Sequence, residues 1–258
     1  MNELEKLSHL IFSKYGNVTR ARGCFLYTSK NVRLTDLYQE NGRAILGWGG
    51  SSAFTMFKNT LSRGITGSFL CGYEYRLEKA VSDFFASQRK VLAFNKKSDA
   101  LKTALLLSSQ STHVYKPWRA APVKWNEIDC IIFEVPLAWT PEIYLLCVKE
   151  EIKCEVQGIK LAAPFISALT KSIYNLSLAL QNRQEKDWFI YDTVLTKYFK
   201  REGPYLYPKV DKNLYDEFVL HCLDQQLVIN PFYEEASIVP FGADAGVFNG
   251  LKKNPFGE

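Results

Sequence analysis

The chain of 258 residues is poor in the side chains that build metal centres and disulfide frameworks. Its three histidines lie far apart, and none belongs to a recognisable metal-binding spacing. No Cys-x-x-Cys pair occurs among the six cysteines, and most of these lie inside apolar runs. This pattern predicts free, buried thiols in a reducing compartment, and it excludes a disulfide scaffold and a zinc finger.

Leader sequences and long apolar runs are lacking as well. The first ten residues, MNELEKLSHL, have neither the basic start nor the apolar segment of a signal peptide. No apolar run reaches the roughly 18 residues that a membrane span requires. The motifs of P-loop proteins, HExxH metalloproteases, GxSxG hydrolases and EF-hands do not occur either. We therefore expect a cytoplasmic protein without a membrane partner.

The composition is that of a folded, soluble protein. Hydrophobic residues make up 47% and charged residues 23% of the chain, which is enough to bury a core of one or two domains. The net charge of +5 is spread thinly and forms no concentrated basic stripe. The charge therefore does not favour a nucleic-acid partner.

The most informative segment is RKVLAFNKKSDALKTA, residues 90–105. Val91 to Phe94 predicts a buried strand, a polar turn follows, and the apolar spacing after it predicts a helix. We expect Ser98 to be the N-cap of this helix. The unpaired backbone N–H groups and the dipole of a helix start favour an anion, so Lys97 and Ser98 could form a phosphate-binding cup. An ordinary strand-to-helix turn has the same pattern.

Elsewhere the chain alternates between the two kinds of element. Helices are predicted over residues 2–15, 51–63, 74–88, 164–181, 187–200 and 213–226, and strands over 24–27, 32–38, 128–135, 142–148, 153–157, 203–210, 227–230 and 237–241. This order predicts an α/β core followed by a smaller α+β lobe. We place the large domain at residues 1–160, and the long connecting helix with the small domain at 161–258.

Several segments, in this order, resemble the class III aminotransferases, fold type I enzymes that use pyridoxal phosphate (PLP). Residues 22–37 resemble the N-terminal hairpin of that family, 44–47 the glycine-bearing loop, 95–104 the phosphate loop with its helix, 164–168 the start of the long helix, and 203–241 the small domain. The likeness implies a shortened, degenerate member of the family. It further implies a reduced PLP-transferase-like large domain with a mainly parallel or mixed sheet, and a small C-terminal α+β domain.

The resemblance marks cofactor-binding positions, and the chain departs from the family at two of them. Ser98 and Asp99 fit the Thr/Ser-Glu/Asp-Ala pattern of the phosphate loop, but Lys97 stands where the family has glycine. Phe133 stands where the family has the aspartate that keeps the pyridine nitrogen of PLP protonated. A phenylalanine cannot perform this task, so the resemblance implies a weakened or lost activity.

The lysine that binds PLP covalently has two candidates. Lys149 follows Pro141-Glu142-Ile143, which resembles a Pro-Asp-Ile stretch just before that lysine in the family. However, two glutamates follow Lys149 where the family has small residues, which is typical of a solvated hairpin charge. Lys160 is the other candidate, and its surroundings match nothing in the family. Glu134, next to Phe133, is interpreted as a paired carboxylate or as a general base.

Three hypotheses follow from these patterns. The first is an aminotransferase-like protein without catalysis or cofactor, which acts as a homodimer, as a heteromer with a full-length aminotransferase, or as a binder of a small anionic ligand. The second is a reduced but active PLP-dependent aminotransferase that uses Lys149, with Lys97, Ser98 and Asp99 at the phosphate. The third is an unrelated soluble α/β protein that binds anions or nucleic acid. The departures from the family favour the first.

Overall fold

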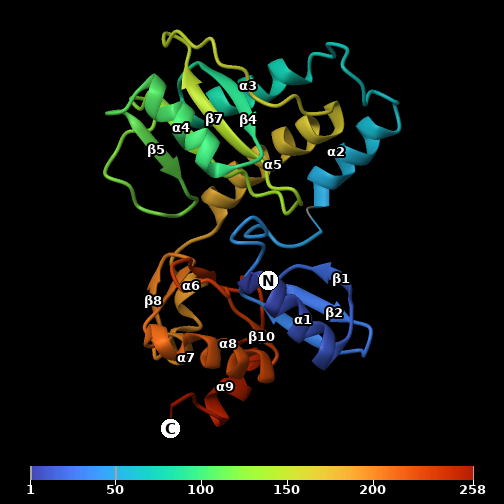
Figure 1. Cartoon of the computed structure of the whole chain (residues 1–258), viewed down its shortest axis with the longest axis vertical. Coiled ribbons are helices and arrows are strands. Elements are labelled where there is room, and N and C mark those ends of the chain that lie inside the picture. Colours follow the sequence, from blue (N-terminus) through green and yellow to red (C-terminus); the bar gives the residue numbers. More distant parts are fainter. Residues whose placement is uncertain (1, 50, 258) are drawn as a thin grey trace. The chain divides into compact units, whose positions relative to one another are not determined.

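The structure is a computed structural model, and it describes residues 2–49 and 51–257 (Figure 1). The chain forms two compact units: unit 1 consists of Met1–Gly49 and Arg183–Glu258, and unit 2 of Gly50–Asn182. The sequence predicted a division into 1–160 and 161–258 instead. The structure divides the chain elsewhere because an N-terminal strand pairs with a C-terminal one inside unit 1.

Unit 1 is built on a four-stranded sheet of order β1-β2-β3-β10. Its strands are β1 (Val18–Arg22), β2 (Phe25–Thr28), β3 (Arg33–Asp36) and β10 (Leu227–Val228). The first three are antiparallel neighbours, which confirms the predicted hairpin, and β10 lies parallel to β3. This last pairing joins the two ends of the sequence in one sheet.

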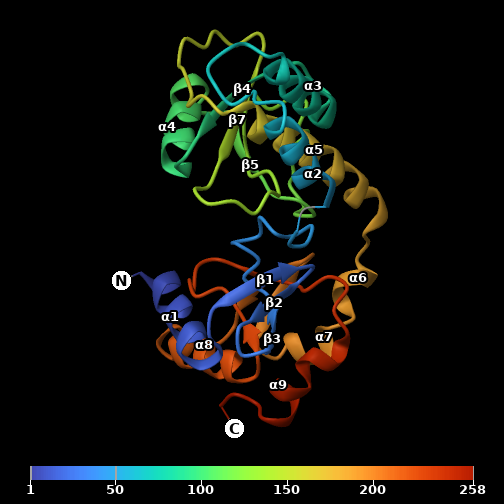
Figure 2. The same ribbon diagram turned by 90° about the vertical axis from the view of Figure 1, so that its right-hand side faces the viewer.

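Two helices accompany this sheet. Helix α1 (Glu3–Tyr15) begins with a capping box, in which Asn2 and Glu5 each bond the backbone N–H of the other. Helix α8 (Tyr215–Asp224) lies beside α1, where the Tyr15 hydroxyl donates to the carbonyl oxygen of Leu223 at 2.8 Å (Figure 2). Both helices fall within the ranges that the sequence predicted.

The remaining elements of unit 1 are short. They are α6 (Lys186–Phe189), α7 (Asp192–Leu195), β8 (Phe199–Glu202), β9 (Tyr205–Pro208), η1 (Lys212–Leu214), β11 (Ser237–Ile238), η2 (Ala245–Phe248) and α9 (Asn249–Lys253). Strands β11, β9 and β8 form a three-stranded sheet in that order. The single helix predicted over 187–200 is therefore wrong. Its last residues pair with β9 instead, because tertiary pairing outweighs the helical pattern of the sequence.

Unit 2 is a mixed α/β unit around a sheet of order β4-β7-β6-β5. Its strands are β4 (Arg89–Phe94), β5 (Thr112–Tyr115), β6 (Cys130–Phe133) and β7 (Tyr144–Lys149). β5 and β6 are parallel, whereas β7 runs antiparallel to both β6 and β4. The mixed sheet confirms the predicted fold class, but the strand predicted over 153–157 does not form.

Helices cover both faces of this sheet. Helix α4 (Lys97–Leu107) lies on one side, and α3 (Tyr73–Phe85) and α5 (Ala163–Asn182) lie on the other, with α2 (Ser51–Leu61) packed against α5 (Figure 2). Side chains alternate along a strand. Ile132 consequently lies in the cluster under Ala104 of α4, whereas the ring of Phe133 stacks on Phe84 of α3.

Candidate cofactor site

The predicted anion site lies where β4 ends and α4 begins. Helix α4 starts at Lys97, and the extended residue Lys96 occupies the N-cap position without a side-chain cap. Ser98 is one residue inside the helix, and its hydroxyl donates to Asp99 Oδ1 at 3.4 Å. The helix start is confirmed, but Ser98 as its N-cap is wrong, because the chain already leaves the extended conformation after Lys96.

The charge nearest to this helix start is paired inside the protein. The Lys97 ammonium lies 2.7 Å from Oε1 of Glu134, which directly follows β6 and is 14% exposed. This oxygen makes no aligned hydrogen bond within the described residues, so the contact is a charge pair. The interpretation of Glu134 as a paired carboxylate is confirmed. A phosphate at this place would meet both the cation and a carboxylate of its own sign.

Phe133 serves the core of unit 2. Its side chain is fully buried and lies 5.2 Å from the rings of both Phe84 and Phe85, and 5.3 Å from the ring of Tyr115. These rings lie on the face that α3 covers, which is opposite to the face of α4. Phe133, which the resemblance places at the position of the family's aspartate, therefore points away from the start of α4.

Lys149 lies at the other end of the same sheet. It pairs with Arg89, the first residue of β4, whereas Lys97 follows the last residues of that strand. Six residues of β4, at about 3.3 Å each, place the two lysines about 17 Å or more apart along the strand. The Lys149 amine donates to the carbonyl oxygen of Glu127 at 3.1 Å and lies 3.9 Å from a carboxylate oxygen of Asp129. The structure does not bring Lys149 to the residues at the start of α4.

Lys160 lies on a segment that runs along the free edge of β4. The Ile159 N–H donates to the carbonyl oxygen of Ala93 at 2.8 Å. Gly158 permits this approach, because a Cβ there would lie 2.6 Å from that oxygen. PLP needs an amine, an acid at its ring nitrogen and an anion cup within one small site. The described residues do not gather these three groups at the start of α4, and so they do not fit PLP there.

The cysteines of this chain are mostly buried. All six cysteines are free, and Cys24, Cys130, Cys147 and Cys222 are buried. Burial raises the pKa of Cys24 and Cys130 to about 11 and that of Cys147 to about 12, so these thiols are not poised nucleophiles. Within residues 2–49 and 51–257 no group of metal-ligating side chains gathers, and no helix has the length and apolar character to span a bilayer.

Sequence reasoning missed a polar cavity in unit 1. Its walls come from residues 31–35 on one side and 224–250 on the other, which meet because β3 pairs with β10. No local motif joins these segments. Asn31 and Gln226, two turn residues with positive φ values, line the cavity. Only the structure shows that these two turns lie on the same cavity.

Comparison with protein-family models gives no match for this chain. Two bacterial proteins are similar in sequence, and both are called uncharacterized. The one from Treponema pallidum is 25% identical over an alignment of 279 residues, and this alignment covers 89% of this chain and 91% of that protein. The one from Borreliella burgdorferi is 24% identical over 248 residues, which cover 92% and 88%. These names carry no function.

Solved structures show the fold. The ornithine aminotransferase of Plasmodium yoelii matches with a TM-score of 0.66 at 12% identity, over 98% of this chain and 97% of that one. The acetylornithine aminotransferase of Elizabethkingia anophelis matches with a TM-score of 0.67 at 10% identity, over 97% of both chains. The chain therefore has the fold of the PLP-dependent aminotransferases, as the sequence predicted. Identities this low establish the fold and nothing about activity.

Proposed function

We propose that this chain is a shortened, degenerate relative of the class III aminotransferases that lacks PLP catalysis and acts as a binding or dimerisation module. The observation that carries the proposal is the pair between Lys97 and Glu134 at the start of α4. A phosphate could bind there only by separating these groups and leaving a carboxylate that is 14% exposed without its cation. Such a carboxylate is costly, so the pair opposes cofactor binding.

Two further observations support the absence of catalysis. Phe133 is held among aromatic rings on the α3 side of the sheet, and no acid takes the place of the family's aspartate at that position. Lys149 is occupied by Glu127 and Asp129 at the other end of the sheet. The second hypothesis, an active enzyme that uses Lys149, would require this lysine to act about 17 Å or more from the helix start.

A nucleic-acid role has less support. Such a role would use aromatic side chains such as Trp118 and Trp125 as stacking platforms for bases. The ring of Trp125 packs 5.0 Å from Tyr115 and 6.1 Å from Phe85, so this half-buried side chain is engaged with the aromatic rings of unit 2. The similarity to aminotransferase structures also removes the premise of an unrelated fold.

An exposed apolar surface in unit 2 supports dimerisation. Phe69 and Leu70, on the loop between α2 and α3, are 91% and 94% exposed. They border a cavity of about 480 Å³ that also has Leu77, Val91 and Ile159 in its wall. Adjacent apolar side chains with this exposure are typical of protein interfaces. We propose a homodimer, or a heteromer with a full-length aminotransferase, in the cytoplasm, where free thiols stay reduced.

The absence of catalysis is tested by titrating the purified chain with PLP and recording the visible absorbance. We expect no saturable protein-bound band and no change on adding an amino acid. A band that appears at one equivalent of PLP and shifts with an amino acid would show that the chain is an active enzyme and overturn the proposal.

Dimerisation is tested separately by light scattering on the full chain. We expect a dimer, or a monomer that pairs with a full-length aminotransferase, and the double variant Phe69→Asp/Leu70→Asp should abolish that association. Leu106→Asp is the matched control, because Leu106 is 86% exposed on α4 of the same unit. Unchanged association in the double variant would remove this surface from the proposal.

A further inference from the structure

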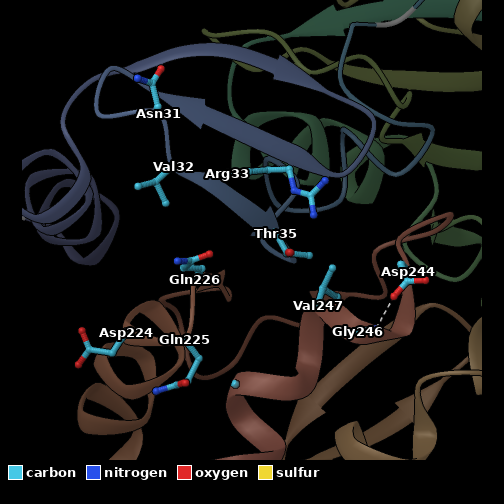
Figure 3. A pocket seen from close by; sticks show the side chains of 11 residues that line it. Asn31, Val32, Arg33, Thr35, Asp224, Gln225, Gln226, Asp244, Gly246 and Val247 are labelled. Atoms are coloured by element: carbon cyan, nitrogen blue, oxygen red, sulfur yellow. Dashed lines mark hydrogen bonds between the residues drawn. The ribbon is translucent and has the colours of Figure 1, made fainter.

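The polar cavity of unit 1 has a volume of about 630 Å³ (Figure 3). Its wall is formed by the start of β3, by the turn between α8 and β10, and by the segment of η2 and α9. Val32 and Val247 are its apolar side chains, and the other side chains of the wall are polar or charged. A cavity of this size and character suits a small polar molecule.

Several polar side chains of this wall have no hydrogen-bond or ion-pair partner among the described residues. They are Asn31, Arg33, Thr35 and Gln226. Thr35 is 4% exposed as a residue, and its hydroxyl makes no hydrogen bond to the described residues while it remains open to the cavity. Polar groups that face a cavity without a protein partner are satisfied there by a ligand or water.

Arg33 is an exposed positive group whose guanidinium packs over an aromatic ring. The carbon of its guanidinium lies 4.6 Å from the ring centroid of Phe25, and the N–H fork has no carboxylate partner among the described residues. Such a fork matches the two oxygens of a carboxylate. One end of the cavity therefore suits an anionic group.

Asp244 supplies the opposite charge on another wall. Its Oδ1 accepts a hydrogen bond from the Gly246 N–H at 2.7 Å, which fixes the carboxylate at the start of η2. The other acid of the wall, Asp224, pairs with Lys14 and is neutralised. Figure 3 shows Arg33 on β3 and Asp244 on the loop, with Thr35 and Val247 between them.

We propose that this cavity binds a small zwitterion of the class of free amino acids and dipeptides, with the carboxylate at Arg33 and the ammonium at Asp244. Thr35 supplies a neutral hydrogen bond between the two charged ends, whereas Asn31 and Gln226 lie on the far side of Arg33 from Asp244. A plain anion would meet the carboxylate of Asp244, and a plain cation would meet Arg33, so the arrangement favours a ligand that carries both charges. The proposal does not depend on whether PLP binds to unit 2.

The test uses the full, isotope-labelled chain and glycylglycine as the probe, followed by two-dimensional NMR. We expect saturable shifts of the side-chain N–H signals of Arg33 and of the backbone N–H signals of Thr35 and Gly246. N-acetylglycine, which has only the carboxylate, and glycinamide, which has only the ammonium, should each bind about tenfold more weakly, because one charged contact is lost.

Matched variants assign the two ends. Arg33→Ala should weaken glycylglycine binding by about tenfold or more. Arg20→Ala is the control and should bind as the wild type does, because Arg20 also lies over a ring, that of Tyr27 at 5.3 Å, but is not in the cavity wall. Asp244→Asn keeps a capping oxygen and removes the charge, so it should reduce the preference for glycylglycine over N-acetylglycine to about twofold or less.

Three outcomes would overturn the proposal. They are the absence of saturable shifts with all three probes, tighter binding of inorganic phosphate than of glycylglycine, and wild-type affinity in Arg33→Ala. Arg33→Gln replaces the alanine variant if that variant loses its dispersed spectrum, since glutamine keeps most of the stem that packs on Phe25.

Discussion

The start of α4 in unit 2 and the polar cavity in unit 1 differ in how their charged groups are partnered. At the start of α4 the cation Lys97 is matched by Glu134 at 2.7 Å. In the cavity wall, the Arg33 guanidinium has no carboxylate partner and the Thr35 hydroxyl has no hydrogen-bond partner among the described residues. The start of α4 resembles a cofactor loop in sequence, whereas the cavity of unit 1 has polar groups without a protein partner. Likeness of residue type therefore does not make a binding site when the protein's own side chains already pair.

The largest expected effect comes from restoring the family's acid at the core side of β6. Phe133→Asp places a carboxylate among the rings of Phe84, Phe85 and Tyr115 and should lower the free energy of unfolding by about 4 kcal/mol or more, which urea denaturation measures. Leu106→Asp on exposed α4 is the control and should change it by less than about 0.5 kcal/mol. A stable Phe133→Asp variant that binds PLP would show that unit 2 can hold the cofactor, and would contradict the conclusion that the start of α4 is not a binding site.

Asp36 offers a carboxylate that is buried but not ion-paired. It accepts hydrogen bonds from the Gln39 N–H at 2.9 Å and from Trp48 Nε1 at 2.5 Å. Burial nevertheless raises the pKa of Asp36 from 3.8 to about 6. The native chain thus holds this proton more tightly than the unfolded chain. The resulting stability is fully present below about pH 4 and is lost as the pH rises through about 6.

This difference corresponds to about 3 kcal/mol between the two ends of that pH range. Asp36→Asn removes the titrating group and keeps one acceptor oxygen. Urea unfolding of both proteins at a series of pH values should show the wild type losing stability relative to the variant between about pH 4 and 6, with a constant difference above. A difference that stays constant over the whole series would contradict the assignment.

The pair of Lys97 and Glu134 should give a smaller effect. A double-mutant cycle with Lys97→Met and Glu134→Gln should yield a coupling of about 1 kcal/mol that shrinks with added salt, because Lys97 is 40% exposed. The control pair of Lys153 and Glu155 has the same chemistry at 2.8 Å but is 87% and 78% exposed, and should show no measurable coupling. Equal coupling in both pairs would show that the pair of Lys97 and Glu134 is no stronger than an exposed surface pair.

The smallest effect on stability is expected in the cavity. Arg33→Ala loses only the contact with the ring of Phe25 and should change the free energy of unfolding by less than about 1 kcal/mol, measured with urea. A much larger loss would identify Arg33 as a structural residue and weaken the case for a ligand at this wall.

The sequence was sufficient for the fold class, but not for the division of the chain into units or for the site. The apolar run around Ile131 and the period of α5 predicted their elements, because these signals are local. The direction of β7 is not local. It places Lys149 beside Arg89 rather than near Lys97, and only the order of the whole sheet determines it. The face to which Phe133 points depends on the same pairing, because side chains alternate along the strand.

The most direct test of the comparison is covalent capture at the lysines. The chain is incubated with PLP, reduced with borohydride, and analysed by intact mass and peptide mapping. We predict no stoichiometric label on Lys97, Lys149 or Lys160, because the first two are paired with carboxylates and none lies in a site that fits PLP. One label per chain at any of these lysines, prevented by prior addition of an amino acid, would contradict the account.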